Sequence, residues 1–191
     1  MIRYSTITFY LVAIACVSNS KAQEKTAASE KATDKKVDVV AFPFEFTAKD
    51  KKFSIRFPAK PAELKQSHKT GVGTIDAKIA IYNAKNESYA VVVSDFPDGH
   101  MRANGLDQVL TTAKQGTLKE VSGKLTGEKP FEMDKYKGQD FVISIDDGGK
   151  QLHIRQLIVG DRLYQIMVGN SADNSDDSLV EPYMNSFKLS L

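Results

Sequence analysis

The chain has 191 residues, of which 26 are Lys or Arg and 24 are Asp or Glu, so its formal net charge is +2. Hydrophobic residues make up 41% of the chain and charged residues 26%. This composition is typical of a globular domain and excludes a collagen-like fibre and a chain that is disordered throughout. The small net charge argues against a nucleic-acid-binding protein, which needs a marked basic excess. A single Cys excludes a disulfide framework.

Residues 1–22 have the layout of a secretory signal peptide. Arg3 makes the start positive, and an apolar run over 7–17 is interrupted only by Thr8. A helix of this length rises only about 16 Å, which is too short to span a bilayer core of about 30 Å. Ser20-Lys21-Ala22 is a small-x-small cleavage pattern. It predicts a mature chain that begins at Gln23 and is periplasmic or secreted.

A second interpretation of the N-terminus predicts that the protein is attached to the membrane by a lipid. Ala13-Ile14-Ala15-Cys16 resembles a bacterial lipobox, in which the Cys is lipidated and becomes the mature N-terminus, although Ala13 stands where Leu is usual. Cys16 is therefore the lipidation candidate, and the alternative location is that of a membrane-anchored lipoprotein. A lipid on Cys16 is the only membrane attachment that the sequence predicts.

The rest of the chain divides into a linker and one domain. Residues 23–41 are rich in Lys, Glu, Asp and Ala and contain no aromatic residue, which is typical of a flexible charged linker. A short solvated helix is the alternative for this segment. Residues 42–191 are enough for a single domain with a substantial core of its own.

Alternation of apolar and polar residues dominates the domain. It predicts strands over 53–57, 75–81, 89–93, 141–145, 152–159 and 162–168. The segment 89–93 is apolar at every position, so this strand should be central in its sheet. Asp146-Asp147-Gly148-Gly149 and Gly160-Asp161 are expected to form hairpin turns, with glycine where a positive φ is required.

Two segments have helical spacing instead. The first carries a stripe of core residues, Leu106, Val109, Leu110, Ala113 and Thr117. Asn104 is expected to cap this helix and Gly116 to end it. Ser178-x-x-Glu181 predicts the cap of a shorter helix, which Pro182 should kink or shorten. The predicted fold class is α+β: an antiparallel sheet of about six or seven strands packed against one long and one short helix.

The order of these elements resembles a known architecture. The segments that carry the resemblance are Phe53-Ser-Ile-Arg-Phe-Pro58 with Pro61, the strand ending at Phe96-Pro97, the helix from Gly105, Tyr136-Lys137-Gly138, Val159-Gly-Asp-Arg-Leu-Tyr164 and Asn185-Ser-Phe-Lys-Leu189. Over most of 42–189 they resemble a group of uncharacterised exported bacterial proteins with a PsbP/Mog1-like α/β sandwich fold. PsbP of photosystem II and Mog1, which binds a small GTPase, are non-catalytic partners of larger assemblies. The resemblance implies a fold and a binding role, and it assigns no site residue.

Residues 94–102 are the one place where titratable groups gather in an irregular segment of the chain. Loops on a rigid scaffold are where binding sites are disproportionately built. The candidates for an interaction loop are Asp95, Phe96, Asp98, His100, Met101 and Arg102. A connecting loop explains the same residues, because Pro-Asp and Asp-Gly are common turn formers.

Motifs for catalysis and for metal binding are absent from the sequence. It contains no Gly-x-Ser-x-Gly and no phosphate-binding loop. His68, His100 and His153 lie in different predicted elements, and none has a second ligand at metal-binding spacing. His153 is expected to share the exposed face of its strand with Arg155. The acidic segment 173–177 lacks the spacing of a calcium loop. We therefore expect no catalytic residue, no metal and no cofactor.

The function expected from the sequence is that of an exported, non-catalytic binding module of the bacterial cell envelope. Its partner should be a protein of the envelope, and nucleic acid is excluded as a partner by the charge balance. The alternative is a small-molecule or lipid carrier, which requires an apolar cavity larger than a packed core leaves. An enzyme is a third interpretation, which requires His100 at hydrogen-bond distance from a carboxylate.

Overall fold

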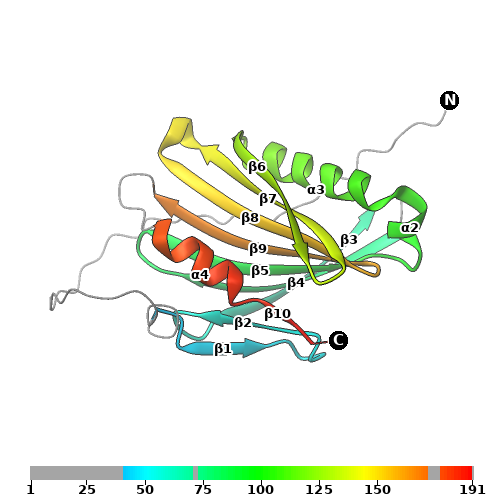
Figure 1. The fold of residues 1–191 in the computed structure, drawn as a ribbon, viewed down its shortest axis with the longest axis horizontal. Helices are drawn as coiled ribbons and strands as arrows, with labels where there is room; N and C mark the ends of the chain where they lie inside the picture. Colours follow the sequence, from blue (N-terminus) through cyan, green and yellow to red (C-terminus); the bar gives the residue numbers. More distant parts are fainter. Residues whose placement is uncertain (1–40, 71–72, 172–176, 191) are drawn as a thin grey trace, which may run out of the picture.

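The computed structural model of the protein describes residues 41–70, 73–171 and 177–190. Within them the chain forms two antiparallel sheets, with helices on both sides of the larger one (Figure 1). The large sheet has seven strands in the spatial order β3 (Ala62–Thr70), β4 (Gly73–Asn83), β5 (Glu87–Asp95), β9 (Arg162–Ser171), β8 (Lys150–Val159), β7 (Tyr136–Ile145) and β6 (Lys124–Met133). The small sheet has the order β1 (Phe44–Thr47), β2 (Phe53–Phe57) and β10 (Lys188–Leu189).

The six predicted strands are confirmed, as β2, β4, β5, β7, β8 and β9. The apolar run at 89–93 lies in β5, an interior strand in which Tyr89 is 1% exposed. The alternating run at 75–81 lies in β4, where Ile75 is buried and Asp76 is exposed. Period-two alternation is therefore a sound guide wherever one face of a strand packs on the core.

The sequence pattern does not predict β1, β3, β6 or β10. The strands β3 and β6 form the two edges of the large sheet, where a strand has a neighbour on one side only. Edge strands are protected from pairing with other chains by charged residues and by Pro. Lys65 and Lys69 on β3 and Lys129 and Pro130 on β6 have this character. Such residues weaken the apolar alternation on which the prediction depends.

The long amphipathic helix is confirmed as α3 (Leu106–Glu120), and its buried residues are Val109, Leu110, Ala113 and Thr117. Its predicted ends are wrong. The helix continues through Gly116, and Gly105 occupies the N-cap position. A further helix, α2 (His100–Asn104), lies in the segment predicted to be an irregular loop. The side chain of Asn104 belongs to α2, where its amide donates to the carbonyl oxygen of His100 at 2.8 Å.

The shorter predicted helix is α4 (Val180–Asn185), which follows the 3-10 turn η3 (Asp177–Leu179). The predicted capping box is wrong, because Leu179 is at the N-cap and α4 has no side-chain cap. The carboxylate of Glu181 instead accepts a hydrogen bond from Arg155 on β8. Pro182 is tolerated in the first turn of this six-residue helix. The α+β prediction is therefore confirmed only in outline, since the strands divide into two sheets and a third helix is present.

The two predicted hairpin turns are confirmed. Gly148 has a φ of 103° and Gly160 a φ of 63°, which is the region that glycine occupies without strain. The first turn contains the 3-10 segment η1 (Asp146–Gly148), in which Asp146 and Asp147 also have positive φ, 53° and 52°. Asp adopts this conformation more readily than most residues.

The large sheet is packed on both faces. Along β8, Leu157 lies on the face covered by the small sheet and α4, in a core cluster with Phe53 and Tyr183. The next residue, Ile158, lies on the opposite face, in a cluster with Leu110 of α3. The molecule is thus a three-layer structure: α3, the large sheet, and the small sheet with α4 (Figure 1).

Candidate functional site

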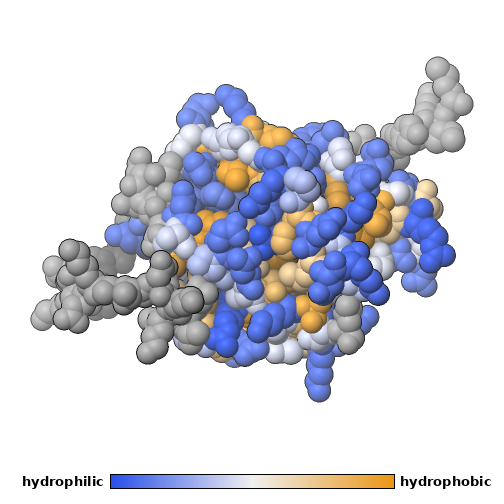
Figure 2. All heavy atoms as spheres, in the orientation of Figure 1, coloured by the Kyte–Doolittle hydropathy of each residue, from blue (hydrophilic) through white to orange (hydrophobic). Residues whose placement is uncertain are grey.

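The exposed surface of the protein has no large apolar patch on the face seen in Figure 2, where hydrophobic residues form small groups among hydrophilic ones. The exposed large hydrophobic residues of the described chain are Leu64, Leu106 and Leu125, which lie on three different elements.

A cleft of about 510 Å³ opens between the small sheet and the β3-β4-β5 side of the large sheet. The residues that line it are Phe46, Ala48, Lys49, Asp50, Phe53, Glu63, Leu64, Lys65, Lys78, Ile79, Ala80, Val91 and Val93. Those from β1 and β2 are mainly aromatic, and those from β5 are aliphatic. Ligand pockets have this combination of apolar walls and a few polar groups.

Aromatic packing fixes the wall that the small sheet contributes. The ring of Phe46 is 6.1 Å from the rings of both Phe53 and Phe57, centroid to centroid. The ring of Phe53 in turn lies edge-on to that of Tyr164 at 5.6 Å and stacks on that of Phe187 at 5.5 Å. Phe46 is half-buried, so this wall is both well packed and accessible from the cleft.

A network of alternating charges includes Asp50 and Lys78, which line the cleft, and Arg162 and Asp95, which do not. Arg162 at the start of β9 donates to Asp95 and, over 2.7 Å, to Asp50 in the β1-β2 turn. Asp95 also accepts from Lys78 at 2.9 Å. The side chain of Arg162 is only 13% exposed, so these bonds are partly shielded from water. They hold the β1-β2 turn against β4, β5 and β9.

The pKa values of the two carboxyls reflect this network. Burial alone would raise the pKa of Asp95, but hydrogen bonds and charge from Arg162 and Lys78 outweigh it and hold the pKa below its ordinary value. The pKa of Asp50 is lowered in the same way, with burial opposed by Arg162 and by the backbone N–H of Lys52. Both groups are therefore ionised at neutral pH.

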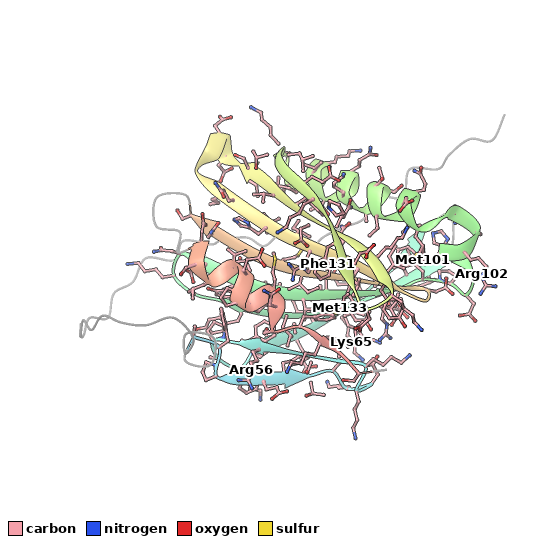
Figure 3. All side chains as sticks on the ribbon, in the orientation of Figure 1. Arg56, Lys65, Met101, Arg102, Phe131 and Met133 are labelled. Atoms are coloured by element: carbon pink, nitrogen blue, oxygen red, sulfur yellow. The ribbon has the colours of Figure 1, made fainter. Side chains whose placement is uncertain are left out.

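Two lysines stand directly opposite each other at the cleft mouth. Lys65 on β3 pairs in register with Lys78 on β4, and both line the cleft. Lys78 is neutralised by Asp95, whereas Lys65 has no ion pair with any residue of the described ranges. Lys65 is among the residues labelled in Figure 3, near the region where the two sheets meet. No sequence motif distinguishes Lys65, because the pairing of β3 with β4 is what brings the two charges together.

The six predicted interaction-loop residues are divided between core and surface. Phe96 and Met101 are buried, 7% and 2% exposed. Asp95 belongs to the ion-pair network of the cleft. Asp98 and Arg102 are exposed, and Figure 3 shows Arg102 turned away from the body of the protein. The carboxylate of Asp161 holds the segment in place by accepting from the N–H groups of Gly99 and Met101, which lowers its pKa.

His100 does not have the geometry of a general base. Its ring stacks on that of Phe96 at 5.1 Å with an interplanar angle of 15°. Its Nδ1 lies 3.3 Å from the amide nitrogen of Asn104. Within the described residues it has no hydrogen bond or ion pair with a carboxylate. The arrangement required by the enzyme interpretation is therefore not assembled at this histidine.

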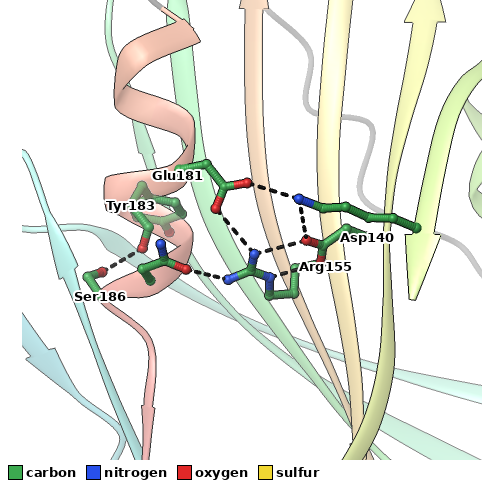
Figure 4. A network of polar contacts seen from close by, with 7 residues as sticks. Asp140, Arg155, Glu181, Tyr183 and Ser186 are labelled. Atoms are coloured by element: carbon green, nitrogen blue, oxygen red, sulfur yellow. Dashed lines mark hydrogen bonds and ion pairs between the residues drawn. The ribbon is translucent and has the colours of Figure 1, made fainter. Parts of the chain in front are cut away.

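His153 and Arg155 share a face of β8, as predicted, but the prediction that this face is exposed is wrong. Arg155 is 3% exposed, because α4 and the tip of β6 cover it. Its Nε and Nη2 donate to the two carboxylate oxygens of Asp140 at 2.8 and 2.9 Å, and its Nη1 donates to Asn185 at 2.8 Å (Figure 4). The ring of Phe131 lies 4.0 Å from the guanidinium carbon. This network connects α4 to the sheet and is structural.

His153 lies beside this network in a smaller cleft of about 220 Å³, which Glu181 and Met184 also line. Its Nε2 is buried and has no hydrogen-bond partner among the described residues. Burial lowers the pKa of His153 below its ordinary value, and the opposing charges of Asp177 and Glu181 only partly offset this effect. The imidazole is therefore neutral at neutral pH.

Several predictions concern residues that the structure does not describe. Cys16, the predicted signal peptide and most of the linker lie in residues 1–40, and most of the acidic segment lies in 172–176. In the described ranges no cluster of three or more His, Cys, Asp or Glu side chains is arranged to hold a metal ion. The same ranges contain no helix with the length and apolarity needed to cross a membrane.

No protein-family model and no curated protein sequence matches the chain. Among solved structures it is similar to the solution structure of cyanobacterial PsbP (CyanoP) from Synechocystis sp. PCC 6803, with a TM-score of 0.55 and 11% identity, over 83% of this chain and 98% of that one. A crystal structure from Bacteroides thetaiotaomicron VPI-5482 is similar over 77% of this chain and 48% of that one, with 10% identity and a TM-score of 0.43. The first similarity confirms the expected fold: the described domain is a PsbP-like α+β sandwich.

Proposed function

We propose that this protein is an exported, non-catalytic binding module of the bacterial cell envelope, and that it binds its ligand in the cleft between the small sheet and β3-β4-β5. The cleft is the observation that supports this proposal. Its volume of about 510 Å³ lies within the range of about 300 to 1,000 Å³ that ligand pockets occupy. Phe46 and Phe53 offer it a rigid aromatic wall.

The cleft favours a small molecule or a lipid over a protein as the ligand. Protein partners usually bind to a broad surface, of the order of 800 Å² on each side. Here apolar side chains such as Phe46 and Leu64 line a cleft, whose lining also includes the charged residues Lys49 and Glu63. This arrangement fits the carrier function better than docking of a protein partner.

Binding in the cleft can be measured with N-phenyl-1-naphthylamine, a neutral apolar dye that fluoresces when it leaves water. The full chain should bind the dye, and Ala48→Phe should weaken binding at least about tenfold, because Ala48 is half-buried and lines the cleft. Ala59→Phe is the matched control, since Ala59 is exposed after β2 and outside the cleft. Absence of dye binding, or equal effects of the two variants, would refute the proposal.

The location in the envelope follows from the sequence of residues 1–22 and requires its own test. Intact mass measured on protein from the membrane and soluble fractions of the native cells fixes the N-terminus and any lipid together. A chain that begins at Gln23, or one that begins at an acylated Cys16, would support export. A mature protein that retains residues 1–22 would exclude it.

A further inference from the structure

The pairing of Lys65 with Lys78 is unusual for a strand pair. Residues directly opposite on antiparallel strands have Cβ atoms about 5 Å apart, and like charges in such positions destabilise the sheet. Asp95 compensates for one of the two charges, because its carboxylate lies 2.9 Å from Lys78. The charge of Lys65 remains without compensation within the described part of the chain.

The other charged residues that line the cleft already have partners. Lys49 pairs with Glu63 at 3.1 Å, and Asp50 pairs with Arg162 at 2.7 Å. With Lys78 paired to Asp95, Lys65 is the one lining cation in the described ranges that is available to a ligand. The cleft therefore offers a single positive charge at its mouth, next to an apolar interior.

The apolar interior starts beside this charge. Ala80 follows Lys78 by two residues on the same face of β4, and Val91 pairs with Ala80 in register on β5. Phe46 and Phe53 form the opposite wall. A ligand with one anionic group at one end and an apolar body at the other would complement both the charge of Lys65 and the apolar lining.

We infer that the ligand is a single-chain amphiphile with one carboxylate, of the fatty-acid class, whose head group binds Lys65 and whose alkyl chain lies between Phe53 and Val91. This inference rests on the proposed function. A single charge-assisted hydrogen bond distinguishes the carboxylate from a neutral head group, and the alkyl chain supplies most of the affinity through burial.

Three ligands with the same ten-carbon chain test the inference: decanoate, 1-decanol and decyltrimethylammonium, each used below its micellar concentration to displace N-phenyl-1-naphthylamine from the full chain. Decanoate should displace the dye best and decyltrimethylammonium worst. Lys65→Glu should weaken decanoate about tenfold, equivalent to 1.4 kcal/mol, and leave 1-decanol unchanged. Lys69→Glu is the matched control, because Lys69 is exposed on the same strand and does not line the cleft.

The outcomes separate this inference from the proposed function. If the dye binds and Ala48→Phe prevents it, but the three ligands displace it equally, the cleft is a binding site without preference for an anion and the inference is wrong. If Lys65→Glu and Lys69→Glu weaken decanoate equally, only the net charge matters and Lys65 is not the head-group site. If the dye itself does not bind, the proposed function fails as well.

Discussion

Arg155 on β8 and Asp140 on β7 form a two-point ion pair across neighbouring strands, with N–O distances of 2.8 and 2.9 Å and both side chains almost fully buried. The pair extends to α4, because Arg155 also donates to Glu181 at 3.4 Å, and Lys129 on β6 lies between the two carboxylates (Figure 4). The network therefore holds α4 and the β6 edge on the same face of the large sheet.

Removing one partner of this pair should be costly. Arg155→Met or Asp140→Leu alone should lower the free energy of unfolding by about 3 to 5 kcal/mol, because each leaves a buried charge without a partner. The double variant should lose less than the two single variants together. Urea unfolding followed by circular dichroism measures the free energy of unfolding of all three variants.

The control is Arg56→Met, which breaks the exposed pair of Arg56 and Glu45 at 3.8 Å and should lower the free energy of unfolding by less than about 1 kcal/mol. Single variants no more destabilised than the control would contradict the structural role.

His153 should make the protein less stable in mild acid. Its pKa is lowered by burial in the folded protein, whereas the unfolded chain has the ordinary value of 6.5. Protons therefore favour the unfolded chain, so this part of the stability is complete above pH 6.5 and is lost as the pH falls through 6.5 toward the folded-state value. His153→Leu should reduce the fall in stability between neutral pH and pH 5. An NMR titration of the His153 ring with a midpoint at or above 6.5 would disprove this account.

Acid should also weaken the network at the cleft mouth, over a lower pH range. The pKa of Asp95 is below the ordinary value of 3.8 in the folded protein, so its contribution to stability is present above about pH 3.8 and is lost as the pH falls through the lower folded-state value. Asp95→Asn should therefore destabilise the protein at neutral pH and flatten its loss of stability below pH 4. Unfolding curves at several pH values would show this, and parallel curves for the variant and the natural protein would count against it.

Gly138 should not tolerate a side chain. A Cβ at this position on β7 would collide with the backbone carbonyl oxygen of Gln156 on β8. Gly138→Ala is expected to lower the free energy of unfolding by about 1 to 3 kcal/mol or more. Gly127→Ala on β6 is the comparison, because a Cβ there meets only Val142, at an ordinary distance of 3.9 Å. The same midpoint of thermal unfolding in both variants would contradict the close approach of β7 and β8 at Gly138.

The sequence predicts the parts of this fold in which one face of an element meets the core. Ile55 and Phe57 on β2, or Val109 and Leu110 on α3, repeat with the period of their element and are buried as expected. The edge strands are not predicted, because charged residues that protect an exposed edge from pairing with other chains interrupt their apolar alternation. The division into two sheets is also invisible, since alternation in β2 does not reveal which strand it pairs with.

The candidate site depends almost wholly on such pairings. Lys65 and Lys78 are thirteen positions apart in the chain, and only the register of β3 and β4 places them side by side. The alternation along β8 predicts an exposed Arg155, but α4 and Phe131 of β6 pack over it and bury it. In contrast, the group of titratable residues at 95–102 is visible in the sequence. The structure gives this segment a structural role, because Phe96 and Met101 pack in the core and the carboxylate of Asp161 accepts hydrogen bonds from its backbone.

The most direct test of the central claim is an NMR titration of the 15N-labelled full chain with decanoate, in which amide shifts locate the binding site. We expect the largest shifts at Phe46, Phe53, Lys65 and Val91, which line the cleft, and their reduction in Ala48→Phe. No saturable shifts at all would contradict the inference that a fatty acid is the ligand, and shifts confined to residues 95–102 would contradict the claim that this protein binds its ligand in the cleft.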